Sequence, residues 1–97
     1  MAKGYWLSVY RSISDPAKLA DYGKLAGPAI QAAGGRVLSR GVAVKAFEAG
    51  LLQRVVLIEF DSVEKAVAAY HSEGYQAALK VFDGAGERDL RIIEGIS

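Results

Sequence analysis

LLQRVVLIEF, residues 51–60, is the strongest strand signal in this sequence. The segment is rich in β-branched and other apolar residues, which is typical of a β-strand. Side chains along a strand point alternately to opposite faces of the sheet, and three apolar side chains share one face here: Val56, Ile58 and Phe60. Val55 and Leu57 share the other face with Glu59. A strand with one face in water should alternate between apolar and polar residues. This segment therefore predicts a sheet that is covered on both faces.

The chain on either side of this strand predicts the order β-α-β-β-α-β. The expected strands cover residues 3–11, 36–40, 51–60 and 88–95. Asp15 and Pro16 predict the start of the first helix, because Asp caps free helix N–H groups and Pro suits the first helical position. Asp61 and Ser62 predict the start of the second helix, which residues 71–74 interrupt. This order is that of the ferredoxin-like unit, an α+β sandwich with both helices on one face of a four-stranded antiparallel sheet.

The second face of the predicted sheet indicates a partner. In the first strand Leu7 and Val9 point away from Trp6 and Tyr10, so this strand also carries apolar side chains on both faces. Helices cover only one face of such a sheet, and soluble monomers seldom expose more than a few hundred Å² of contiguous apolar surface. Closed two-fold dimers are the commonest oligomers. The sequence therefore predicts a homodimer in which two copies pack sheet against sheet.

Length and composition limit the class of protein. The chain has 97 residues, which is the size of one domain, residues 1–97. Its 12 basic and 11 acidic side chains are mixed along the sequence, so we expect neither nucleic acid nor a membrane surface as a partner. Cysteine is absent and His71 is the only histidine, so neither a disulfide nor a multi-histidine metal site is expected within one chain. With no apolar signal segment, we expect a cytoplasmic protein that needs no metal and no cofactor.

Several short motifs of this chain occur together in a known family. The most specific run extends from residue 59 to residue 76 and overlaps IEFDS at residues 58–62 and YHSEGYQ at residues 70–76. KGYW at the start, Arg40-Gly41 and IEG at the end also fit, so the likeness covers essentially the whole chain. The sequence thus resembles domain-of-unknown-function family 1330 (DUF1330). The resemblance implies a dimeric α+β barrel, in which two ferredoxin-like subunits pack their sheets into a barrel with a ligand-sized cavity.

The resemblance implies several classes of function, because the dimeric α+β barrel superfamily includes both enzymes and simple ligand binders. The first expectation is a homodimer with one small-molecule cavity per subunit. One alternative is a cofactor-independent monooxygenase-like or isomerase-like enzyme that acts on a small organic substrate. The other alternative is a non-catalytic structural or interaction module whose barrel is filled by side chains.

Four residues are candidate ligand contacts: Arg40, Glu59, His71 and Tyr75. An unpaired carboxylate is costly to bury, so Glu59 needs a partner, and Arg40 at the end of the neighbouring strand is the expected one. This pair either borders the cavity or only fixes the register of the strands. His71 is either a titrating contact, since its ordinary pKa is near ~6.5, or a group that satisfies loose backbone atoms at the helix break. Tyr75 follows helical spacing with apolar residues and is either a cavity residue or part of the core.

Overall fold

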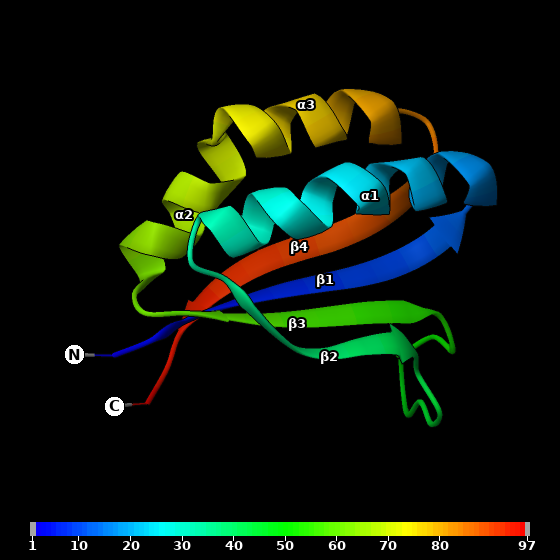
Figure 1. The fold of residues 1–97 in the computed structure, drawn as a ribbon. Coiled ribbons are helices and arrows are strands. Elements are labelled where there is room, and N and C mark those ends of the chain that lie inside the picture. The colour runs from blue at the N-terminus through cyan, green and yellow to red at the C-terminus, as the bar shows by residue number, and fades with distance from the viewer. Residues whose placement is uncertain (1, 97) are drawn as a thin grey trace.

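A computed structural model describes residues 2–96, in which three helices cover one face of a four-stranded sheet (Figure 1). The elements along the chain are β1 (Gly4–Ile13), α1 (Pro16–Ala32), β2 (Arg36–Val42), β3 (Arg54–Phe60), α2 (Val63–His71), α3 (Glu73–Phe82) and β4 (Gly86–Glu94). Neighbouring strands are antiparallel, and their order across the sheet is β2-β3-β1-β4. This is the ferredoxin-like arrangement, so the predicted α+β fold is confirmed.

The predicted strands are all present, but their ends differ from the expected ones. The largest difference is at β3, which begins at Arg54 and not at residue 51. Pairing explains the later start, because Arg54 is the first residue of β3 that pairs with β2. One further hydrogen bond joins the N–H of Ala43 to the carbonyl of Gln53 at 3.0 Å. The residues between Ala43 and Gln53 have no partner strand, so an extended conformation there would form no hydrogen bonds between strands.

Side-chain caps begin the helices at the predicted places. Asp15 accepts a hydrogen bond from a backbone N–H in the first turn of α1 at 3.0 Å, and Ser62 does the same for α2 at 3.1 Å. Ser72 ends α2 and caps α3, because its Oγ accepts from the N–H of Tyr75 at 3.3 Å. After α1, Gly34 has a φ of 94°, which glycine adopts without strain. Within residues 2–96, none of the helices is long and apolar enough to cross a membrane.

The core lies between the sheet and the helices, around Trp6 of β1. Trp6 is 1% exposed and pairs with Ile58 of β3 and Ile92 of β4. Its ring stacks on Phe60 with centroids 6.0 Å apart and meets Tyr75 edge-on at 5.0 Å. The helices also contribute buried alanines, which allow close approach to the sheet: Ala26, Ala66, Ala69 and Ala78. Four of the five largest fully buried side chains come from the strands: Trp6, Tyr10, Ile58 and Phe60.

The opposite face of the sheet is apolar along its middle and is not covered by the helices (Figure 1). Leu7 of β1 pairs with Leu57 of β3, and Val9 pairs with Val55. Ile93 of β4 lies on the same face and is 59% exposed. The prediction of apolar side chains on both faces of these strands is confirmed. We call this surface the open face.

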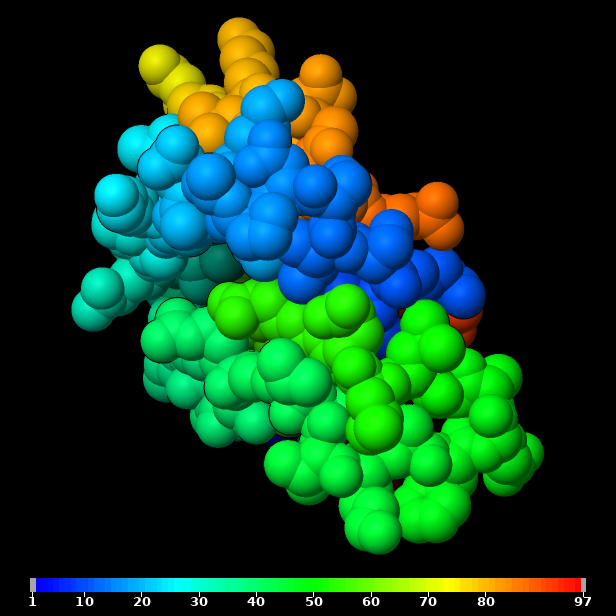
Figure 2. All heavy atoms as spheres, turned by 90° about the vertical axis from the view of Figure 1, so that its right-hand side faces the viewer, coloured from blue at the N-terminus to red at the C-terminus, as the bar shows by residue number. Residues whose placement is uncertain are grey.

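The loop between β2 and β3, residues 43–53, projects beyond the sheet (Figure 2). It contains a turn, in which the N–H of Gly50 donates to the carbonyl of Phe47 at 2.9 Å and Glu48 has a φ of 54°. Apolar side chains on this loop are exposed to solvent: Phe47 is 78% exposed and Val44 is 92% exposed. The loop therefore adds to the apolar surface that the protein presents to its surroundings.

Candidate functional site

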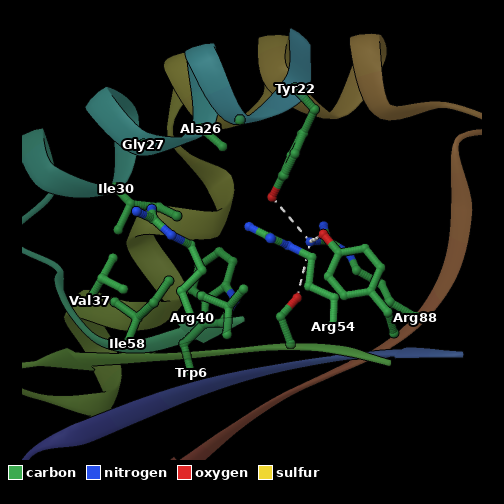
Figure 3. A pocket seen from close by; sticks show the side chains of 14 residues that line it. Trp6, Tyr22, Ala26, Gly27, Ile30, Val37, Arg40, Arg54, Ile58 and Arg88 are labelled. Carbon is green, nitrogen blue, oxygen red and sulfur yellow. Dashed lines mark hydrogen bonds between the residues drawn. The ribbon is translucent and has the colours of Figure 1, made fainter. Parts of the chain in front are cut away.

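A cavity of about 70 Å³ lies between α1 and the helix-facing side of the sheet (Figure 3). One part of its wall is apolar: Trp6, Ala26, Ile30, Val37, Val56 and Ile58. The other part carries hydroxyl and guanidinium groups: Ser8, Tyr10, Tyr22, Arg40, Arg54 and Arg88. Gly23 and Gly27 of α1 complete the lining. An apolar wall with a few convergent polar groups is the usual construction of a small-molecule site.

Strand alternation brings the polar lining residues to the helix side of the sheet. Ser8 and Tyr10 follow Trp6 at intervals of two along β1, so all three point the same way. Arg54 and Arg88 continue the inward-facing apolar rows of β3 and β4 in the same manner. Tyr10 and Arg88 are direct partners across the sheet. The sequence of each strand thus changes from apolar to polar toward the end of the sheet where the cavity lies.

The guanidinium group of Arg88 binds four hydroxyl groups. Its Nη1 donates to Ser8 Oγ at 3.1 Å, to Tyr22 Oη at 3.1 Å and to Tyr10 Oη at 3.5 Å. Its Nη2 donates to Tyr75 Oη at 2.8 Å, and the hydroxyl oxygens of Tyr22 and Tyr75 are 2.6 Å apart. Figure 3 shows the Tyr22 side chain directed from α1 toward this group. We call these five residues the Arg88 cluster.

Burial controls the protonation states in the Arg88 cluster. It raises the pKa of Tyr75 well above the ordinary value of 10.0, and it raises the pKa of Tyr10 in the same direction. Both phenols therefore stay protonated across the physiological range. Arg88 stays charged, and its Cζ lies 4.7 Å from the centroid of the Phe82 ring, a cation–π contact. The cluster thus carries one positive charge that pairs with no carboxylate in residues 2–96.

Arg40 and Arg54 bring two further guanidinium groups to the cavity. Figure 3 shows both side chains extending from their strands toward α1. The Nε atom of Arg54 is buried and has no hydrogen-bond partner within residues 2–96. Neither arginine forms an ion pair in the described part of the chain. Together with Arg88 they make the cavity positively charged.

The predicted pairing of Arg40 with Glu59 is wrong. β2 carries a bulge between Val37 and Ser39, where its register against β3 shifts by one residue. The shift makes Arg40 the partner of Val56, so Arg40 faces the helices while Glu59 faces the opposite side. In a regular strand Arg40 would share the face of Glu59, because a slip of one residue moves every later side chain to the other face.

Arg36 is the partner that Glu59 does have. Arg36 Nε donates to Glu59 Oε1 at 3.1 Å, and Arg36 Nη2 donates to Asp61 Oδ1 at 3.0 Å. Tyr5 Oη donates to Glu59 Oε2 at 3.0 Å. The hydrogen bonds from Tyr5 and Arg36 lower the pKa of Glu59, and Arg36 lowers the pKa of Asp61. Glu59 is therefore paired as expected, but on the open face and away from the cavity.

The other two predicted contacts lie in different surroundings. His71 is exposed at the end of α2 and lines a separate surface depression, where its ring meets Tyr70 edge-on at 5.5 Å. Tyr75 is 0% exposed and belongs to the Arg88 cluster, directly behind the cavity wall. The structure thus brings Arg40 and Tyr75 to the cavity region and leaves Glu59 and His71 elsewhere.

Sequence reasoning missed Arg54, Arg88 and the hydroxyl of Tyr22 as site groups. A signal for the arginines exists, because each has the same strand parity as buried apolar residues, and a charge in a buried row needs partners. The role of Tyr22 has no such local signal. Its helical spacing with Ala26 predicts a buried ring, but its hydroxyl meets that of Tyr75 across 53 positions of sequence.

The chemistry of the cavity is that of a hydrogen-bond donor site. None of its lining residues is Asp, Glu or His, so the lining offers no side chain that takes up a proton near neutral pH. Across residues 2–96, no group of three or more His, Asp or Glu side chains could hold a metal ion. The residues present can fix an acceptor-rich ligand and surround its apolar part.

Comparison with families and curated proteins gives one match. The family model DUF1330, described as a domain of unknown function, matches residues 3–96, which is nearly the whole chain. The sequence matches none of the curated proteins with which it was compared. The family expected from the sequence motifs is confirmed.

Solved structures with the same fold come from several bacteria. A protein of unknown function from Rhodopseudomonas palustris is 20% identical with a TM-score of 0.74, over 99% of this chain and 84% of that one. A dimeric ferredoxin-like protein of unknown function from Thermobifida fusca is 14% identical with a TM-score of 0.64, over 96% of this chain and 89% of that one. A candidate antibiotic biosynthesis monooxygenase from Nitrosomonas europaea is 15% identical with a TM-score of 0.62, over 98% of this chain and 99% of that one. At these identities the likeness establishes the fold.

Proposed function

We propose that this chain, which belongs to the DUF1330 family, is a single cytoplasmic domain that forms a homodimer and binds a small organic molecule. The binding site is the cavity between α1 and the sheet, one in each subunit. The observation that carries the proposal is the construction of its wall. An apolar surface built around Trp6 faces guanidinium groups, and one of their N–H groups has no hydrogen-bond partner within residues 2–96. This combination is typical of a ligand site and unfavourable in a protein core.

The cavity supports binding more strongly than catalysis. Acid–base catalysis needs a group whose pKa lies near the working pH, usually His, Glu or Asp. The lining contains none of these, and the hydroxyl of Tyr75 behind it has its pKa raised by burial. His71, the residue best suited to such work, lines a different depression. These observations favour a ligand-binding protein over the monooxygenase-like or isomerase-like alternative.

The open face supports the homodimer. Leu7, Val9, Val55 and Leu57 lie together on it, and no described element of the chain covers them. Packing two copies face to face would remove this apolar area from water at about 25 cal/mol per Å². The structural relative from Thermobifida fusca is described as dimeric, which is consistent with a homodimer here. Since the cavity lies on the helix side, the dimer leaves it accessible.

A variant that fills the cavity tests the proposed site. A Cβ on Gly23 meets no heavy atom within 4 Å, so Gly23→Leu has room at its Cβ to bring a side chain to the cavity wall. The change also favours the helix, since Leu has a higher helix propensity than Gly by roughly 0.6–0.8 kcal/mol. Ala32→Leu is the matched control, because Ala32 is an exposed α1 residue outside the cavity lining.

Native mass spectrometry of the purified proteins gives the readout. We expect the parent and Ala32→Leu dimers to carry a non-covalent small molecule, and we expect the Gly23→Leu dimer to have lost it. Retention of the same molecule by Gly23→Leu would place the site elsewhere. Absence of any added mass from the parent, with no stabilisation by a metabolite library in thermal melting, would favour the filled structural module. Release of a chemically altered ligand would favour the enzyme.

A further inference from the structure

We infer that the ligand of this cavity is a small organic acid, whose carboxylate lies among Arg40, Arg54 and Arg88 and whose apolar part lies against Trp6. The inference rests on the proposed function and adds the chemical class of the ligand. Its grounds are the charge of the lining, the surplus of hydrogen-bond donors and the shape of the apolar wall.

The arginines of the cavity differ from two arginines outside it, Arg36 and Arg91, which are paired with carboxylates. Arg36 is held by Glu59 and Asp61, and Arg91 forms two hydrogen bonds of 3.0 Å with Asp89. Arg40, Arg54 and Arg88 have no carboxylate partner within residues 2–96, although they line one small space. Arg54 and Arg88 are half-buried and Arg40 is exposed, and like charges that are partly removed from water destabilise the fold unless a counter-charge joins them. A bound anion would supply that charge.

The Arg88 cluster has more donors than acceptors. Four hydroxyl groups accept hydrogen bonds from Arg88, and each of them also brings one proton of its own. The bond between Tyr22 and Tyr75 uses one of these four protons, which leaves three without an acceptor in residues 2–96. Arginine has no acceptor atom to offer them. A carboxylate, which only accepts, complements this set.

Arg54 provides the most direct evidence for a missing acceptor. Its Nε–H is buried and unpaired within the described chain, although buried N–H groups are nearly always hydrogen-bonded. The Arg54 side chain extends from β3 into the space below α1 (Figure 3). A carboxylate in that space could take the Nε–H and a terminal N–H of the same guanidinium, which is the bidentate geometry that arginine favours.

The rest of the wall distinguishes an organic acid from an inorganic anion. Opposite the polar end, Ala26, Ile30, Val56 and Ile58 form a surface that would leave phosphate or sulfate poorly solvated. The volume of about 70 Å³ suits a short aliphatic or single-ring acid, part of which extends out of the cavity beside the exposed side chain of Arg40. The apolar wall contributes affinity for the body of the ligand, and the arginines select its charge.

A pair of ligands of equal shape tests the charge selection. Benzoate and benzamide differ in little but the negative charge, and inorganic phosphate is an anion without an apolar body. Each is titrated into ¹⁵N-labelled dimer, and the Nε–H signals of Arg54 and Arg88 are followed by NMR. We expect benzoate to shift both signals and to bind at least about tenfold more tightly than benzamide or phosphate, because charge-assisted hydrogen bonds are roughly twice as strong as neutral ones.

Substitutions assign the effect to the cavity. In Arg54→Met the preference for benzoate over benzamide should fall by about tenfold. Arg11→Met makes the same change of charge at an exposed residue that does not line the cavity, and it should bind benzoate like the parent. Circular dichroism and size-exclusion chromatography confirm that each variant remains folded and dimeric. Arg88→Lys, which keeps the charge of the cluster, provides a second variant if Arg54→Met does not fold.

Each other outcome contradicts a separate part of the reasoning. Equal affinity for benzoate and benzamide would overturn the inference and leave the proposed binding function standing. Tighter binding of phosphate than of benzoate would show that the apolar wall plays no part in recognition. No shift with any of the three at millimolar concentration would overturn the inference, while the co-purified molecule seen by mass spectrometry decides the proposed function independently.

Discussion

Removing the hydroxyl group of Tyr75 should destabilise the fold strongly, although the ring stays in place. This hydroxyl accepts from Arg88 Nη2 at 2.8 Å and lies 2.6 Å from the hydroxyl of Tyr22, and the Tyr75 side chain is fully buried. A hydrogen bond to a charged group contributes about 1.5–3 kcal/mol and a neutral one about 0.5–1.5 kcal/mol. Tyr75→Phe loses one of each and leaves a guanidinium N–H without its partner. We therefore expect the free energy of unfolding to fall by about 2–4 kcal/mol.

The matched control is Tyr70→Phe, which removes the same atom from a neighbouring ring. The rings of Tyr70 and Tyr75 lie 5.4 Å apart, but the Tyr70 hydroxyl takes part in no hydrogen bond within residues 2–96. This variant should stay within about 0.5 kcal/mol of the parent. Urea unfolding followed by circular dichroism measures both changes, at one protomer concentration because dimer stability depends on it.

Two results would refute this account of the Arg88 cluster. A Tyr75→Phe variant as stable as Tyr70→Phe would mean that the hydroxyl contacts contribute nothing net. The second result concerns Tyr22→Phe combined with Tyr75→Phe. Because these hydroxyls share one hydrogen bond and one guanidinium, the double variant should lose less stability than the sum of the single ones. Strict additivity would show that the two hydroxyls act independently.

Three further predictions concern the dimer, pH and metal ions. Leu57→Asp should shift the dimer toward monomer in light scattering, because an unpaired charge is unfavourable at an interface core, whereas Ala68→Asp on an exposed part of α2 should not; equal effects would contradict the open-face interface. The pKa of Glu59 is lower in the folded chain than its ordinary 4.5, so its stabilising effect is present above that pH and is lost as the pH falls through the folded-state value. Glu59→Gln should therefore flatten the decline of unfolding free energy between about pH 5 and about pH 3, and an unchanged decline would show that the pair with Arg36 has no net effect. Chelator and reductant together should leave the melting temperature unchanged, and a large drop with chelator alone would reveal a metal site between subunits.

Most of the fold could be predicted because its signals are local. Alternation along residues 51–60 determines which side chains face the helices, and this depends only on the geometry of an extended chain. Asp15 and Ser62 begin the helices through hydrogen bonds to backbone atoms three residues away, so their effect is contained in a few positions. Ser72 likewise marks the break between α2 and α3.

The site could be predicted only in part, because a single bulge reverses one face assignment. Counting by twos along β2 puts Arg40 on the same face of the sheet as Glu59, and the bulge after Val37 moves it to the helix side. Nothing within β2 itself requires the bulge, which depends on how the strand fits against β3. Glu59 does have a charged partner, but that partner is Arg36, which lies directly opposite Glu59 in the register of β2 against β3.

The sequence by itself determined the family, the order of the elements and the apolar character of both sheet faces, because these follow from residue types and their spacing. Only the tertiary structure decided that Arg88 would meet Ser8, Tyr22 and Tyr75, which lie 80, 66 and 13 positions away along the chain. Such contacts form only when β1 and β4 pair in the correct register and when α1 and α3 pack on the sheet at the matching position. A half-buried guanidinium group without a carboxylate partner among residues 2–96 becomes visible only then, because burial and partners belong to the assembled fold and not to any segment of the chain.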